Sequence, residues 1–362
     1  MIDIVNLPKL WILPLAWTWN ITLLGLTFDI GCALIYRFMN KNNPYKTQIF
    51  NFIKQIALFN LIWLCISILI FFTIFGPAFS GLSMLFSPII TLLMFALAIR
   101  TLAIKFYDVH FFGNKSNYAY LNSSTKKFTN WIITDTSIVI LCIFSAIFGT
   151  ILNGIPFYLN NSKQLISLFR IEDCLNPTSL LIFLLLIIFS ITQASVFCYI
   201  KTQLHKMKII ALISTILLFT IISCSIFPIE NLIEEFHYTY FSKNIIRSVF
   251  ITLPISALIL IAAIINKRYT LALITSSGII KIFMIIFDLI LFPFIVPSSI
   301  DTSQSLICIN SFSNIQTLVV SLIFVIPMLI AALCTVWIYN KLINSKTLAT
   351  SAKTKNSVIT KL

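Results

Sequence analysis

Five charged residues lie inside long apolar segments of this sequence, and they are the residues best placed to carry chemistry. They are Asp29, Arg100, Asp135, Lys281 and Asp288. A charge at the centre of a membrane-spanning helix costs about 2.5–3.5 kcal/mol on an insertion scale, so such charges usually pair or line a path for protons or substrate. Each of the five is therefore a candidate for an ion pair or for proton transfer inside a membrane.

Asp29, Arg100 and Asp135 allow two interpretations. In the first they belong to a proton path or a buried ion pair, with Arg100 paired to Asp29 or to Asp135. In the second, Arg100 and Asp135 extend their polar ends to the membrane surface, as side chains near helix ends do. Asp29 lies deeper in its segment, so we expect it to be the protonatable group.

Lys281 and Asp288 form a second candidate charge pair. They are seven residues apart, which is two helical turns, and they therefore share a face. We predict that each contacts a polar group on another helix or on another subunit.

The three histidines, His110, His205 and His237, lie outside the apolar segments. A buried haem usually needs an axial histidine from a helix. The sequence also lacks a glycine-rich phosphate loop and the spacings typical of metal-binding cysteines. We therefore expect this chain to bind no haem and no metal directly.

The composition determines the class of protein that must position these residues. The 362 residues are 59% hydrophobic and 10% charged, with a mean hydropathy of +1.00. Soluble domains are about 45–50% apolar and about 25% charged. Water-soluble, disordered and disulfide-stapled proteins are excluded, and an all-α polytopic membrane protein is predicted.

Nine segments are long and apolar enough to span a membrane, which needs about 20 residues. They are 11–35, 56–75, 82–104, 131–152, 178–200, 209–227, 248–265, 270–295 and 315–339.

The basic residues predict how these segments are oriented. Of the 25 Lys and Arg residues, 18 lie in alternate connections, which are 36–55, 105–130, 201–208, 266–269 and the tail from 340. Cytoplasmic loops carry such an excess, so the N-terminus is predicted outside and the C-terminus in the cytoplasm. This also accounts for the net charge of +14 without a nucleic-acid partner.

Three patches of small or kinking residues fall where predicted helices meet the outer surface. They are FGPAFSG at Phe75–Gly81, FGTILNGIPF at Phe148–Phe157 and FPFIVPSS at Phe292–Ser299. Together with other short motifs in the same order, they resemble subunit II of the cytochrome bd quinol oxidases. The further motifs are TFDIG at Thr27–Gly31, Asn60 with Trp63, Arg100 after AFSG, LNP at Leu175–Pro177, ITQA at Ile191–Ala194 and Gln316-Thr317-Leu318.

This resemblance implies two four-helix bundles, 1–177 and 178–314, followed by a peripheral ninth helix at 315–340 and a basic tail at 341–362. It also implies a haem-bearing subunit I as partner, with b- and d-type haems that oxidise quinol and reduce oxygen to water. Subunit II would stabilise that partner in the bacterial inner membrane, contact lipid and quinone, and help to admit cytoplasmic protons.

The sequence departs from the family at positions that matter for protons. Two family acids are replaced, by Leu26 and by Leu58. A leucine cannot relay a proton, so a path through this chain either runs through Asp29 or is lost. Asn60 is the polar neighbour that could hold water beside Asp29.

Two other functions are compatible with these residues. A degenerate family member could serve only as an assembly or scaffold subunit, which the lost acids favour. A secondary transporter could bind substrate near the midplane through Arg100, Lys281 and Asp288.

Overall fold

The structure is a computed structural model that describes residues 7–39, 45–112, 123–159, 165–225 and 243–307, and Ile330. The described part is dominated by helices. They are α1 Leu7–Phe38, α2 Lys46–Ile74, α3 Gly76–Leu85, α4 Ser87–Phe112, α5 Ser123–Asn153, α6 Pro177–Thr202, α7 His205–Cys224, α9 Lys243–Ile265 and α10 Tyr269–Leu291. Within this part, eight helices, all except α3, are long and apolar enough to cross a membrane.

Most predicted spans are confirmed, with three differences. The span predicted at 82–104 is divided, because α3 takes up its first residues and the chain turns at Phe86 before α4 begins. The span predicted at 270–295 ends at Leu291, because Pro293 cannot continue the helical hydrogen bonding. His205 was expected in a loop but is the first residue of α7. The predicted ninth helix and the tail lie outside the described residues.

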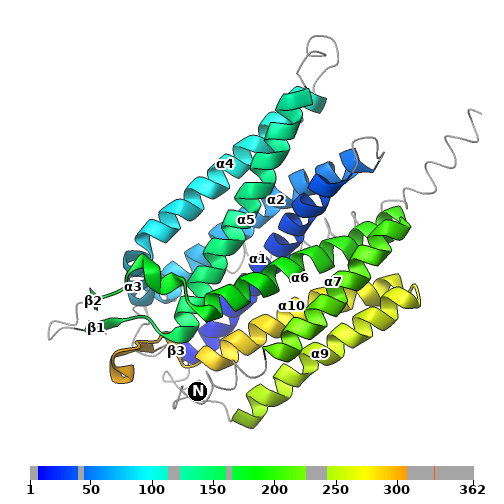
Figure 1. Ribbon diagram of the computed structural model, residues 1–362. Coiled ribbons are helices and arrows are strands. Elements are labelled where there is room, and N and C mark those ends of the chain that lie inside the picture. The colour runs from blue at the N-terminus through cyan, green and yellow to red at the C-terminus, as the bar shows by residue number, and fades with distance from the viewer. Residues whose placement is uncertain are drawn as a thin grey trace, which may run out of the picture.

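The packing centres on α1. This helix contacts α2, α5, α6 and α10, while α4 packs along α5, and α9 packs against α7 and α10 (Figure 1). At the α1–α6 contact, a Cβ atom on Gly31 would lie 1.9 Å from the carbonyl oxygen of Ser190, so only glycine permits this approach. The division into bundles at residue 177 stays a prediction.

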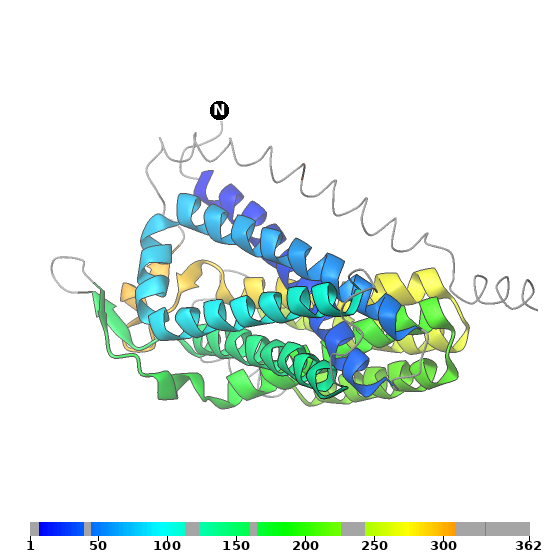
Figure 2. The ribbon, with the colours of Figure 1, turned by 90° about the horizontal axis from the view of Figure 1, so that it is seen from above.

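The helix ends define two different ends of the molecule. One, here called the basic end, is where α1, α4, α6 and α9 finish, and its described residues include Arg37, Lys46, Lys206 and Arg268. The other, the strand end, carries α3 and all the described strands (Figures 1 and 2). Basic residues therefore gather where the alternating loops predicted them.

The three patches of small residues meet at the strand end. Strand β1 (Phe157–Leu159) pairs antiparallel with β2 (Leu165–Ser167), and β3 (Phe294–Val296) pairs with β4 (Leu306–Ile307). Ile155 forms a bridge with Ser298, whose hydroxyl donates to the Phe157 carbonyl at 2.6 Å. Segments far apart in the chain are thus joined outside the helices.

Candidate functional site

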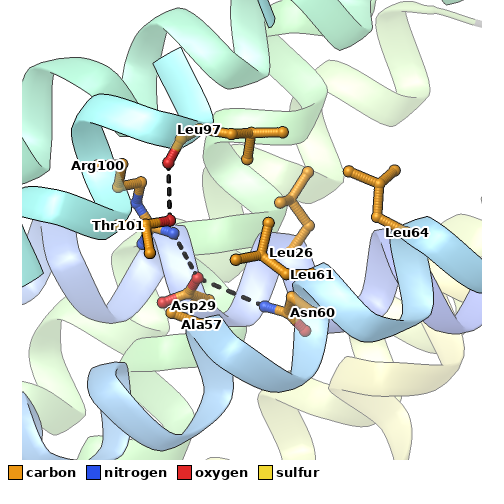
Figure 3. Close-up of a pocket in the computed structure, with 9 residues that line it drawn as sticks. All are labelled: Leu26, Asp29, Ala57, Asn60, Leu61, Leu64, Leu97, Arg100 and Thr101. Atoms are coloured by element: carbon orange, nitrogen blue, oxygen red, sulfur yellow. Dashed lines mark hydrogen bonds and ion pairs between the residues drawn. The ribbon is translucent and has the colours of Figure 1, made fainter. Parts of the chain in front are cut away.

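A buried ion pair joins α1 to α4. Asp29 is fully buried on α1, and Arg100 Nη1 donates to its Oδ2 at 2.6 Å. The Arg100 side chain is 5% exposed, and its Nε donates to Ser137 Oγ on α5 at 2.9 Å. Two of the charges predicted from the sequence are therefore in direct contact (Figure 3). Three helices, α1, α4 and α5, hold them.

Asn60 adds a fourth helix to this group. From α2, its Nδ2 donates to the Gly25 carbonyl at 2.8 Å and lies 3.4 Å from Asp29 Oδ2. A Cβ atom on Gly25 would lie 2.1 Å from Asn60 Oδ1, so a larger residue at that position of α1 would displace the Asn60 side chain. Asn60 is thus the polar neighbour of Asp29 that the sequence predicted.

A small cavity opens beside these side chains. The space open to the centre of a water molecule is about 20 Å³, which is enough for one water. Within the described part of the chain, Asp29 Oδ1 and Arg100 Nη2 are buried without a hydrogen-bond partner. The cavity is lined by Leu26, Asp29, Ala57, Asn60, Leu61, Leu64, Leu97, Arg100 and Thr101.

The free energy needed to bury the charges of Asp29 and Arg100 limits the functions that this site can have. A buried charge left without its partner costs about 3–5 kcal/mol, so each member of the pair requires the other. The two free polar atoms can bind a water molecule, which would place an exchangeable proton against the Asp29 carboxylate. The site therefore suits either a fixed structural charge pair or a proton station.

Asp135 does not belong to this group. It forms an ion pair with Arg37 at 2.9 Å, and its side chain is 53% exposed. The Arg37 guanidinium also stacks 3.9 Å from the centroid of the Trp131 ring, at the basic end of the molecule. The alternative partner for Arg100 is thus excluded, and the exposure of Asp135 agrees with the interfacial interpretation.

Lys281 and Asp288 lie away from the Asp29 site. Both are on α10, where Lys281 is exposed and Asp288 is half-buried. The described residues include no ion-pair partner for either. Because Arg100 is bound to Asp29, the three side chains named for a transporter site do not converge in this part of the protein.

The family acid positions face different directions. Leu26 lines the cavity, whereas Leu58 is 63% exposed on α2. An acid at position 58 would therefore point out of this chain, toward lipid or a partner. The two positions face different directions because of how α1 and α2 are rotated about their own axes, and a sequence motif does not specify that rotation.

One histidine side chain, that of His205, belongs to the described residues. His205 is exposed at the first residue of α7, and within the described ranges no three metal-ligating side chains of the His, Cys, Asp or Glu type come together. His110 and His237 lie among residues whose side chains are not described.

Three comparisons agree with this architecture. The model of the family described as cytochrome bd terminal oxidase subunit II matches residues 7–342. A probable cytochrome oxidase subunit 2 from Haemophilus influenzae is 24% identical over 352 residues, covering 87% of this chain and 88% of that protein. A chain of the bd oxidase from Geobacillus thermodenitrificans shares the fold, with a TM-score of 0.65 at 12% identity over 94% of this chain and 99% of that one.

The match to the family extends over nearly the whole chain, across all the spanning helices that the structure describes. This multi-pass membrane protein therefore belongs to the cytochrome bd terminal oxidase subunit II family and is part of an oxidoreductase complex.

Proposed function

We propose that this chain is the haem-free second subunit of a bd-type quinol:oxygen oxidoreductase in the bacterial inner membrane. It stabilises a haem-bearing subunit I, and its Asp29 site takes part in proton uptake from the cytoplasm. The observation that carries the proton role is the buried pair of Asp29 and Arg100, with two unpaired polar atoms beside a cavity sized for one water.

The partner supplies the redox chemistry in this proposal. Among the described helices that can span a membrane, histidine occurs only at the basic end, as His110 in the last turn of α4 and His205 at the start of α7, so the b- and d-type haems are assigned to subunit I. Those haems would oxidise quinol and reduce oxygen. The residues of this chain would hold the partner in place and hold a proton near the carboxylate of Asp29.

A surface for the partner is available beside the Asp29 site. Helix α2 exposes a row of apolar side chains spaced by three, four or seven residues, and α4 exposes a second row spaced by three or four, as in helix–helix contacts. The row on α2 includes the outward-facing Leu58, so a partner there would cover the position of the lost acid. The rows are Leu58, Ile62, Leu69 and Phe72 on α2, and Leu92, Phe95, Ile99, Leu102 and Phe106 on α4.

The proton role is tested by removing the charge pair as a unit. The single variant Asp29→Asn leaves Arg100 without its counter-charge, which costs about 3–5 kcal/mol and lowers the yield of the complex. The double variant Asp29→Asn with Arg100→Gln removes both charges. We expect the double variant to assemble with normal haem bands but to consume oxygen more slowly than the native complex.

The alternative, a scaffold subunit, is favoured by one observation, that both replaced acids are leucines and one of them points away from the site. A double variant with normal haem content and the native rate of oxygen uptake would refute the proton role and support the scaffold. If the native complex were purified without b and d haem bands, the proposal that this chain is an oxidase subunit would itself be refuted.

A further inference from the structure

A second buried polar layer lies between the Asp29 site and the basic end. The hydroxyls of Tyr36 on α1 and Tyr107 on α4 are 2.6 Å apart and buried. The side chain of Asn130 on α5 lies beside the Tyr36 hydroxyl. Asn130 Oδ1 is buried and has no partner within the described part of the chain.

This layer repeats the Asp29 site two helical turns away. Each of its members lies seven residues from a member of the Asp29 site on the same helix, and seven residues span about 10.5 Å on one helix face. Because α5 runs opposite to α1 and α4, all three steps lead toward the basic end. The pairs are Asp29 with Tyr36, Arg100 with Tyr107, and Ser137 with Asn130.

The residues between the two layers are buried, and three of them, Ala33, Ala103 and Thr134, are small. Helical spacing also places Cys32, Ile104 and Ile133 there. Helix α4 packs along α5 rather than along α1, so Arg100 and Tyr107 reach across to α1 with their long side chains. The smallest side chains along the seam between the layers are therefore the methyl groups of Ala33 and Ala103 and the side chain of Thr134.

The tyrosine layer is also close to water. Lys46, which is partly exposed, lies with its Nζ 4.9 Å from the centroid of the Tyr36 ring and donates to the Met39 carbonyl at 2.9 Å. Both contacts are at the basic end, where the topology places the cytoplasm. The layer thus lies directly beneath the surface from which protons would come.

We propose that the Tyr36–Tyr107 hydroxyl pair is the inlet through which cytoplasmic protons reach the Asp29 site. This inference rests on the proposed function and adds two residues to it. A tyrosine hydroxyl is both donor and acceptor. The first hydroxyl oxygen accepts a proton from water and passes its own proton to the second hydroxyl oxygen, 2.6 Å away. The second releases its original proton toward the Asp29 side, and rotation of both O–H bonds restores the pair without net charge.

The test removes the two hydroxyls and keeps the rings. The variant Tyr36→Phe with Tyr107→Phe is measured in the intact complex with its partner. We expect normal haem bands, a fall in oxygen turnover of about tenfold or more, and a larger solvent deuterium isotope effect, because proton delivery becomes rate-limiting. Added acetic acid, a small diffusible proton donor, is expected to restore part of the rate.

A second tyrosine pair provides the matched control. Tyr199 on α6 and Tyr269 on α10 also pack against each other, with ring centroids 5.8 Å apart, but they are not on the α1–α4–α5 seam. The variant Tyr199→Phe with Tyr269→Phe removes the same two hydroxyls and is expected to keep the native turnover and isotope effect.

A blocking variant tests the same route with both hydroxyls present. Ala103→Leu fills the seam between the layers and is expected to slow turnover at normal haem content. Ala257→Leu, at a fully buried position of α9, is the control for overpacking alone. If the double phenylalanine variant loses haem, the comparison of Ala103→Leu with Ala257→Leu tests the inlet instead. Native turnover in Ala103→Leu overturns the inlet.

The outcomes separate this inference from the proposed function. Native turnover in Tyr36→Phe with Tyr107→Phe, alongside slow turnover in Asp29→Asn with Arg100→Gln, overturns the inlet alone. Native turnover in both overturns the proton role of the Asp29 site as well. A slow tyrosine variant without a larger isotope effect or rescue by acid indicates a purely structural pair and also overturns the inlet.

Discussion

A single guanidinium group, that of Arg100, connects three helices at the candidate site. It bonds Asp29 through Nη1 and Ser137 through Nε, and so uses the fixed fork of the side chain in two directions. The geometry at this position therefore requires arginine and not only a positive charge, because a lysine ammonium on a flexible stem cannot reproduce the fork.

We predict that Arg100→Lys keeps the ion pair but loses the bond to Ser137, with a cost of about 1.5–3 kcal/mol for a charge-assisted hydrogen bond. The complex should release its haem at a lower temperature, read from the loss of the absorption bands on heating. Arg37→Lys is the control, because that ion pair is exposed and surface pairs are worth about 0–1 kcal/mol. Equal losses in both variants would contradict a special role for the Arg100 fork.

The sequence predicted part of this site. It identified Asp29 and Arg100, because a charge in an apolar segment is costly unless it is paired or functional. It identified Asn60 through the motif shared with the family. It could not choose between Asp29 and Asp135 as the partner of Arg100, since that choice depends on how the helices rotate about their axes. Tyr36 and Tyr107 were missed, although each stands seven residues from a charge already singled out.

At the scale of elements, the contact between α1 and α6 determines how closely the central helices approach. Gly31 faces the backbone of Ser190, and Phe28 packs edge-to-face on Phe197 with centroids 5.0 Å apart. The spans themselves were predictable because length and hydropathy decide whether a segment crosses a membrane. The break at Phe86 that separates α3 from α4 was not, since the residues of α3 are as apolar as those of the spans around it.

We predict that Gly31→Ala forces α1 and α6 apart and costs about 1–3 kcal/mol through overpacking. The measurement is the temperature at which the purified complex loses its haem spectrum. Gly278→Ala on α10 is the matched control, because a Cβ atom there meets nothing within 4 Å and alanine favours a helix by about 1 kcal/mol. A Gly31→Ala complex as stable as the native one would show that this contact is not tight in the membrane.

At the scale of the whole molecule, the two ends differ in charge and in architecture. Basic side chains gather at one end, and strands with short connecting helices cover the other, where Leu175 is 87% exposed. Because membrane proteins keep basic loops in the cytoplasm, this polarity predicts the orientation of the chain.

We predict that a membrane-impermeant maleimide labels Leu175→Cys in intact spheroplasts, because the strand end faces outward. Lys206→Cys, exposed near the start of α7 at the basic end, should be labelled only after the membrane is opened. The unmodified chain serves as the control for reaction at native cysteines. If Lys206→Cys were labelled in intact spheroplasts and Leu175→Cys only after opening, the predicted topology would be wrong. The tyrosine layer would then lie on the outer side.

The bridge between Ile155 and Ser298 has a consequence for biosynthesis. A ribosome synthesises Ile155 long before Ser298. Four spanning helices, α6, α7, α9 and α10, must enter the membrane in between. The strand end can therefore close only on a chain whose later helices are already inserted. Its closure would mark the completed insertion of α10, and a protease acting from outside would distinguish stalled chains from finished ones at this point.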